Sequence, residues 1–157
     1  MYRLFHDIYL CLCEGDRRVF RDFGLSNSQY RVLELLCEND GQKLTELSDK
    51  MLVARSTITR IIDQVEGAGL VERTPDPEDR RAQRAILTTA GEDLFQRARQ
   101  AHSDSLEGRF AALDSAEQMQ LTTLLDKLGD NLRAALIAQE QAWNSNEGGA
   151  DHSIAED

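Results

Sequence analysis

Apolar residues recur at helical spacing over most of this chain. They predict one helix over 2–23 and a second over 29–39, which Gly24 and Ser26 are suited to separate by ending the first and capping the next. A short helix with Thr45 as its cap is expected over 46–51. The helix that follows begins at Arg55 and ends at Gly67 and Gly69, and its apolar residues form one buried stripe: Ile58, Ile61, Ile62 and Val65.

Beyond this helix, short apolar runs broken by turn residues replace the helical spacing. Residues 70–73 and 84–88 are predicted to be strands, joined by a Pro-Asp-Pro turn and an arginine-rich tip into a hairpin. Helices are expected over 89–113 and 116–141, with Thr89 and Ser115 as their caps and a leucine stripe along the second. The small, acidic and glycine-rich residues 144–157 are predicted to be a disordered tail.

Length and composition narrow the class of protein. A chain of 157 residues with 41% hydrophobic residues is predicted to form one soluble domain over 1–143. No apolar run is long enough to span or be targeted to a membrane, so we expect a cytoplasmic protein with no membrane partner. Three cysteines without a secretory signal argue against a disulfide framework. The histidines are scattered, so we expect no metal site and no cofactor. The sequence has no Gly-rich phosphate loop and no Ser-His-Asp or Cys-His spacing, so we do not expect an enzyme.

Charge is distributed unevenly along the chain. The formal net charge is -10, but residues 41–90 contain 8 basic and 8 acidic groups, so the acidity belongs to the two ends. Within this neutral middle, 54–62 and 80–85 contain arginines and no acids. Because screening at physiological salt acts over about 8 Å, a local basic patch matters more than the total charge. The overall acidity therefore does not exclude nucleic acid as a partner.

A short helix, a three-residue turn and a helix with a buried stripe form the helix-turn-helix pattern. The face opposite the stripe is short, polar and cationic, as a helix that enters the major groove requires. Its acids come toward the far end, whereas the N-terminal residues of a recognition helix usually contact bases. The candidate DNA-binding residues on this helix are Arg55, Ser56, Thr57, Thr59, Arg60 and Gln64, with Asp63 on the same face.

The hairpin tip adds further arginines beside this helix. Arg81 is expected to enter the minor groove, whose negative potential attracts arginine, while Arg80 and Arg84 contact phosphates. Asp79 is expected to brace the wing with Arg73 as its partner. Helix and hairpin together predict a winged helix-turn-helix over 26–90, in a mainly α fold with a small β-hairpin wing. The apolar terminal stripes predict dimerisation helices over 1–23 and 115–140.

From about Leu44 to Leu94 the sequence closely resembles the MarR family of bacterial transcription regulators, most specifically in "STITRIIDQVEGAGLVER" and "DPEDRR…ILTTAG". The resemblance implies a homodimer, built from the first and last helices, that binds a palindromic operator in double-stranded DNA and usually represses. It assigns the recognition helix to Arg55–Gln64 and the minor-groove contact to Arg81. The chain departs from the family at Leu52, where glycine is common, and at Ala54, where Ser or Thr usually caps the recognition helix.

Family members often respond to small aromatic or anionic effectors, in a cleft between the dimerisation helices and the DNA-binding lobe. The candidates that the resemblance suggests here are His6, Tyr9, Arg17 and Tyr30. Two alternatives remain open. One is a winged-helix protein-interaction module without specific DNA binding, which the acidic total charge fits. The other is a redox-responsive regulator acting through Cys11 and Cys13, although the family's peroxide-sensing cysteine position falls near Tyr2.

Overall fold

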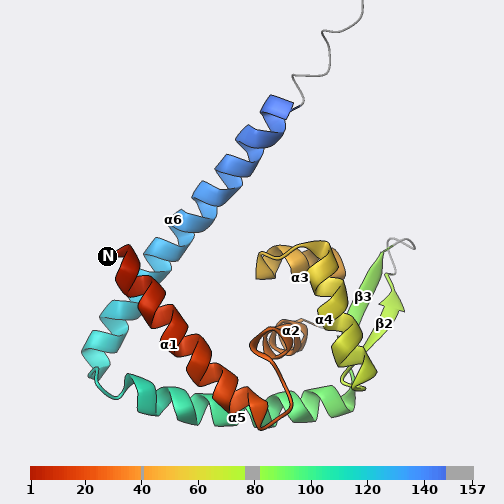
Figure 1. Cartoon of the computed structure of the whole chain (residues 1–157), viewed down its shortest axis with the longest axis horizontal. Helices are drawn as coiled ribbons and strands as arrows, with labels where there is room; N and C mark the ends of the chain where they lie inside the picture. Colours follow the sequence, from red (N-terminus) through yellow and green to blue (C-terminus); the bar gives the residue numbers. More distant parts are fainter. Residues whose placement is uncertain (40, 77–81, 148–157) are drawn as a thin grey trace, which may run out of the picture. The chain divides into compact units, whose positions relative to one another are not determined.

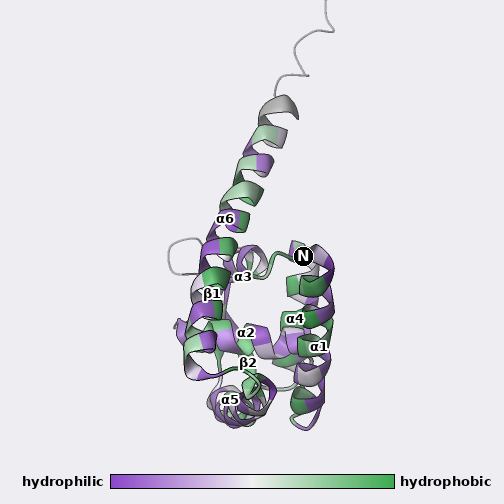
Figure 2. Cartoon of the chain, turned by 90° about the vertical axis from the view of Figure 1, so that its left-hand side faces the viewer, coloured by the Kyte–Doolittle hydropathy of each residue, from purple (hydrophilic) through white to green (hydrophobic). Residues whose placement is uncertain are grey.

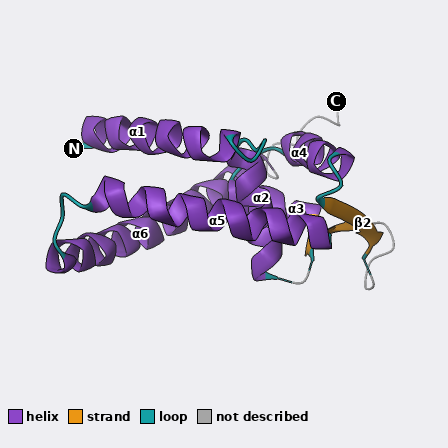
Figure 3. Cartoon of the chain, turned by 90° about the horizontal axis from the view of Figure 1, so that it is seen from below, coloured by secondary structure: helices purple, strands orange, loops and turns teal. Residues whose placement is uncertain are grey.

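The computed structural model describes residues 1–39, 41–76 and 82–147, most of them helical (Figures 1 and 3). They fall into two compact units, 1–108 and 109–157, where the sequence predicted a single domain. The mainly α fold with a small antiparallel sheet is confirmed. Its elements are α1 (Tyr2–Arg21), α2 (Asn27–Glu38), β1 (Gln42–Lys43), α3 (Leu44–Met51), α4 (Arg55–Gly67), β2 (Val71–Pro75), β3 (Gln83–Leu87), α5 (Thr89–Phe110) and α6 (Ser115–Glu147).

The core of the larger unit is built by α2 and α4 and closed by α1 and α5. The predicted stripe of α4 is confirmed, since all four of its residues are at most 5% exposed. Phe20 of α1 stacks on Tyr30 of α2 with ring centroids 3.9 Å apart, and Phe95 of α5 lies against Tyr30 at 5.5 Å. Burial of these apolar side chains fixes the place of α4, so that its opposite face points outward.

The sheet has three antiparallel strands in the order β1-β3-β2, with Gln42 and Arg73 both opposite Ala85. The sequence predicted only the hairpin β2–β3 and took 39–43 as a turn, because a two-residue strand shows no alternation. Gln42 is nonetheless 2% exposed. Its amide is satisfied at both ends, donating to the Leu35 carbonyl and accepting from Lys50 Nζ at 2.6 Å, and this makes its burial tolerable.

The capping residue was predicted correctly at α2 and wrongly at three other helices. Ser26 and Gln29 form a capping box, as the position of Ser26 predicted. The caps expected at Thr45, Thr89 and Ser115 are wrong, because each of these residues already lies inside its helix. At α5 and α6 the residue just before supplies the acceptor: Thr88 Oγ for an amide three residues on (3.0 Å), and Asp114 Oδ1 for two amides (2.8 and 2.9 Å).

The turn between α3 and α4 has the two unusual residues that the sequence indicated. Leu52 adopts the left-handed conformation, with φ 54° and ψ 44°, and its side chain is 75% exposed. A left-handed non-glycine residue costs roughly 1–2 kcal/mol, and a leucine this exposed gains little from burial to offset that cost. Ala54 is the N-cap of α4 and makes no side-chain cap bond. The Thr57 amide donates to the Ala54 carbonyl at 2.9 Å, whereas the amides of Arg55 and Ser56 have no side-chain cap.

In the smaller unit, α6 runs 33 residues to Glu147, four residues into the predicted tail. The prediction of disorder is therefore wrong for 144–147, and 148–157 lie outside the described residues. Apolar positions recur along both α6 and α1 (Figure 2), and several are half exposed or more: Leu4, Ile8, Tyr9, Leu124, Leu132 and Leu136. None of the described helices is both long and apolar enough to span a bilayer.

Candidate nucleic-acid interface

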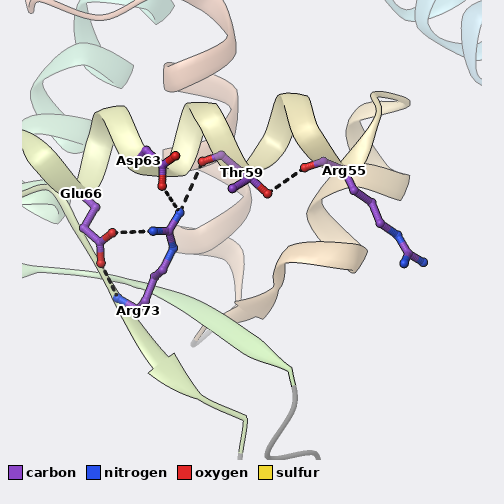
Figure 4. Close-up of polar contacts among 5 residues, drawn as sticks. All are labelled: Arg55, Thr59, Asp63, Glu66 and Arg73. Carbon is purple, nitrogen blue, oxygen red and sulfur yellow. Dashed lines mark hydrogen bonds and ion pairs between the residues drawn. The ribbon is translucent and has the colours of Figure 1, made fainter.

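The exposed face of α4 contains most of the residues expected to bind DNA. Ser56 and Thr59 are exposed and Thr57 is half-buried beside the core stripe. Arg55 and Arg60 are exposed, and neither side chain makes a hydrogen bond or ion pair with any residue in the described ranges. In Figure 4 the Arg55 guanidinium extends away from its neighbours. Two unpaired cations on an otherwise uncharged first two turns suit a polyanionic partner.

The N-terminus of α4 adds backbone donors to these arginines. Its 13 residues begin without a side-chain cap at Ala54, and since the Thr57 amide donates to the Ala54 carbonyl at 2.9 Å, the amides without a side-chain acceptor are those of Arg55 and Ser56. The positive end of the helix dipole lies at the same place. A phosphate oxygen would satisfy these amides, as anions commonly do at helix N-termini.

Two of the predicted contact residues are already engaged within the protein. The Thr59 hydroxyl donates to the Arg55 carbonyl at 2.9 Å, so its oxygen remains available only as an acceptor. Gln64 accepts through Oε1 from Gln29 Nε2 of α2 at 3.3 Å, which leaves its own amide hydrogens to donate. Both side chains are therefore oriented before any partner binds.

Arg73 on β2 connects the hairpin to α4 (Figure 4). Nη2 lies 2.5 Å from Asp63 Oδ1 and Nη1 lies 2.9 Å from Glu66 Oε2. The Arg73 backbone amide donates to the other Glu66 oxygen at 3.2 Å, and Nη2 also donates to the Thr59 carbonyl at 3.3 Å. One guanidinium thus holds two turns of α4 against the first strand of the wing.

The contacts of Arg73 bear on two predictions from sequence. Arg73 was expected to pair with Asp79, which lies outside the described residues, so that pairing stays a prediction. Among the described residues, Arg73 pairs with Asp63 and Glu66. Asp63 was placed on the groove-facing surface without a partner, and Glu66 was given no role. The spacing of two acids three residues apart on α4, followed by an arginine on the next strand, is the signal that would have found the cluster.

The loop end of the hairpin has a second ionic cluster that the sequence analysis missed. Asp76 is 2% exposed, with Lys43 Nζ at 3.5 Å and Arg84 Nη1 at 3.9 Å. Arg84 also donates to the Gly41 carbonyl at 2.6 Å. Arg84 was expected to project from the hairpin tip, but it lies within β3, one residue from the loop end of the strand, and its guanidinium is turned toward Gly41 and Asp76. Arg80 and Arg81 lie outside the described residues, so their roles stay predictions.

The four effector candidates do not come together around one cavity. His6 and Tyr9 are exposed on α1, and Arg17 lines a surface hollow of about 400 Å³ with Glu14, Arg18 and Arg21. Tyr30 is buried in the core, where desolvation and the Glu34 charge raise the pKa of its phenol to about 12. His102 of α5 is partly buried, with Nε2 3.0 Å from Asp16 Oδ1.

The cysteines of α1 do not form a pair. Cys11 is exposed and Cys13 is half-buried, and both thiols are free. A hydrogen bond with Cys13 raises the pKa of Tyr9, one turn earlier on the helix. Within the described ranges no three His, Cys, Asp or Glu side chains gather in a way that would hold a metal ion. The redox alternative through Cys11 and Cys13 stays a prediction.

Comparisons with known proteins agree with this geometry. The model of the MarR family matches residues 25–82. The chain is 31% identical to the uncharacterized HTH-type transcriptional regulator YkoM of Bacillus subtilis (strain 168), over 82% of this chain and 84% of the relative. It is 29% identical to the HTH-type transcriptional repressor IacR of Pseudomonas putida, over 73% and 69%. A crystal structure of a mutant MarR from E. coli complexed with operator DNA is similar with a TM-score of 0.75 and 25% identity, covering 80% of this chain and 91% of that chain.

Proposed function

The chain belongs to the MarR family of transcriptional regulators, and on that premise we propose that it is a homodimeric repressor that binds a palindromic operator. In this proposal α4 enters the major groove and the β2–β3 hairpin reaches the adjacent minor groove. Membership of the family also places the chain among helix-turn-helix regulators rather than enzymes. The similar E. coli protein was crystallised with operator DNA, which supports the same kind of partner here.

The exposed face of α4 is the observation that carries the proposal. Arg55 and Arg60 are exposed and unpaired among the described residues, while the apolar stripe behind them is buried. Arginine reads guanine or phosphate, and hydroxyl and amide groups such as those of Ser56 and Gln64 bond either base edges or phosphates. The uncapped N-terminus at Ala54 supplies amides for a phosphate.

The arginines of the wing complete the proposed mode of DNA binding. We assign the minor-groove contact to Arg81 and a phosphate contact to Arg80, on the strength of the family resemblance. Arg84 is assigned to the ionic cluster at the loop end of the hairpin strands, where it lies beside Asp76. The ionic clusters around Arg73 and Asp76 hold the wing against α4 and α3, so little order has to be gained when DNA binds.

Exposed apolar side chains on α1 and α6 support the dimer. Leu4 and Ile8 on α1 are 65% and 54% exposed, and Leu132 and Leu136 on α6 are 54% and 50% exposed. Repeated apolar positions along two helices are typical of a protein interface rather than of a free surface. Two-fold symmetry would then present two copies of α4 at half-sites roughly 34–36 Å apart, as a palindrome requires.

Repression follows in this proposal from operator binding by a cytoplasmic dimer, and the similar IacR is named a repressor. A small aromatic or anionic effector would regulate it, in keeping with the family. Among the candidate residues, Arg17 is the one suited to an anion, since it lines the hollow together with Arg18 and Arg21, whereas the phenol of Tyr30 is buried.

The test is fluorescence anisotropy with DNA from upstream of the protein's own gene, over a salt series, followed by a selected DNA pool. Wild type should bind specifically, with an affinity that falls steeply as salt rises. Arg60→Ala should weaken binding roughly tenfold and lower the salt slope by about one. Arg97→Ala, which removes an exposed arginine of α5, is the matched control and should change neither.

Two results would overturn the proposal. Binding to both DNA samples no tighter than to random DNA would favour the protein-interaction alternative. Equal losses for Arg60→Ala and Arg97→Ala would mean that general charge, rather than the face of α4, attracts the DNA.

A further inference from the structure

We propose that Arg73 keeps Arg60 available for DNA by holding the carboxylate of Asp63 away from it. The inference rests on the proposed DNA-binding role of α4 and goes beyond it, because it gives a residue outside the interface control over one inside it. In the wild-type structure Asp63 is paired with Arg73 and Arg60 is unpaired among the described residues.

Arg73 is well placed to hold this carboxylate. Its side chain is 20% exposed, while that of Asp63 is 56% exposed, so the arginine reaches the acid from the protein side. The guanidinium is anchored a second time on Glu66 at 2.9 Å and a third time on the Thr59 carbonyl at 3.3 Å. A fork held at several points loses little further entropy when it binds Asp63, which favours this pair over a pair of two free side chains.

Arg60 is the competing partner on α4 itself. Residues three apart on a helix are neighbours, so Asp63 can reach Arg60 when Arg73 does not hold it. The same order, arginine first and acid three residues later, forms an ion pair on α2 between Arg31 and Glu34. An Arg60 paired with Asp63 would lose both the charge and the direction that a base or phosphate contact needs.

The charge balance of the α4 face points the same way. Arg55 and Arg60 are offset on this helix by Asp63 and Glu66, so the helix alone presents no net charge. Arg73 adds one positive charge in direct contact with both carboxylates. Without it, two partly exposed carboxylates would face the phosphates, whose charge repels them.

The experiment measures the effect of Arg60→Ala on operator affinity in three backgrounds. In wild type the loss should be roughly tenfold, with the salt slope lower by about one. With Arg73→Gln the loss should shrink to less than about twofold, because Asp63 has already captured Arg60. With Arg73→Gln and Asp63→Asn together, the roughly tenfold loss should return.

A matched control separates this effect from a general change of charge. Glu72→Gln removes an exposed carboxylate of β2 next to Arg73, but Glu72 is not a helical neighbour of Arg60. Combined with Arg73→Gln, it should leave the loss from Arg60→Ala small. If Glu72→Gln restored the loss as well as Asp63→Asn does, the capture of Arg60 would be refuted.

A purely structural role for Arg73 gives a different pattern. Bracing of the wing alone predicts that Arg60→Ala costs the same roughly tenfold in the Arg73→Gln background as in wild type, and that result would overturn the inference. Should Arg73→Gln fail to fold by circular dichroism, Arg73→Lys serves instead. A single ammonium cannot hold both acids as a fork does, so the loss from Arg60→Ala should then be intermediate, and an unchanged loss would overturn the inference. Failure of the proposed function itself would appear earlier, as wild type that does not distinguish operator from random DNA.

Discussion

At the scale of single residues, Tyr30 shows how one side chain joins three helices of the larger unit. Its ring stacks on Phe20 of α1 and lies 5.5 Å from both Phe95 and His102 of α5. Burial is the main cause that raises the pKa of the phenol to about 12, and the Glu34 carboxylate adds to it. The core therefore accepts the neutral phenol and opposes its ionised form.

This pKa predicts how stability depends on alkaline pH. The unfolded phenol ionises near pH 10, so between about pH 10 and 12 the folded state retains a proton that the unfolded state has lost. Stability should be unaffected by this group below pH 10 and fall by roughly 2–3 kcal/mol toward pH 12. Urea unfolding from pH 8 to 12 should show that loss in wild type. Tyr30→Phe, which keeps the ring, should show a smaller one, and equal slopes for both proteins would contradict the prediction.

At the scale of elements, the start of α5 is locked to the end of the α4–β2 turn. The Thr88 amide donates to the Leu70 carbonyl at 3.1 Å, and the Thr88 hydroxyl donates to the Gly69 carbonyl at 2.7 Å while capping α5. Gly91 is buried in this joint, where a Cβ would lie 1.9 Å from the Leu70 oxygen. Only a residue without a side chain lets the backbones of α5 and the turn approach this closely.

We therefore expect Gly91→Ala to destabilise the larger unit by about 1–3 kcal/mol, as overpacking of a rigid site does. The matched control is Gly108→Ala, since a Cβ at Gly108 would meet nothing within 4 Å. Because alanine favours the helix more than glycine, this control should be neutral or stabilising by up to about 1 kcal/mol. Thermal unfolding followed by circular dichroism compares the two, and equal midpoints would show that the joint relaxes freely.

At the scale of the whole molecule, many large apolar side chains of the terminal helices α1 and α6 are exposed in the single chain. Leu132 is 54% exposed, although it belongs to the leucine stripe of α6. Each terminal helix therefore has apolar side chains that the single chain does not bury. The proposed dimer is the assembly that would cover them.

Leu132→Asp should convert the dimer to a monomer without unfolding the chain, because the leucine it replaces is largely exposed in the single chain. A charge buried at the centre of an apolar interface costs several kcal/mol. Light scattering coupled to size exclusion at micromolar concentration measures the mass. Thr123→Asp adds the same charge to an exposed position on the opposite side of α6 and should leave the mass unchanged. If the wild-type protein had the mass of a monomer, the proposed dimer would be refuted.

The sequence alone determined those features that depend on neighbours along the chain. The spacing of Ile58, Ile61 and Val65 predicted the buried side of α4, and hence its polar face, because helix geometry repeats every 3.6 residues. Ser26 predicted the start of α2 for the same local reason. The helix-turn-helix spacing and the motifs after it were specific enough to indicate the family.

Tertiary structure decided every feature that joins residues far apart in the chain. Strand β1 forms because it pairs with β3, and the sequence of its two residues is too short to predict that pairing. Arg73 binds Asp63 and Glu66 because packing brings β2 against α4. Arg84 contacts Gly41 and Asp76 because it lies in a strand that is paired on both sides. Charge and hydrogen bonding act over a few ångströms, so the partner of a charged side chain is known only when the fold has placed the candidates around it.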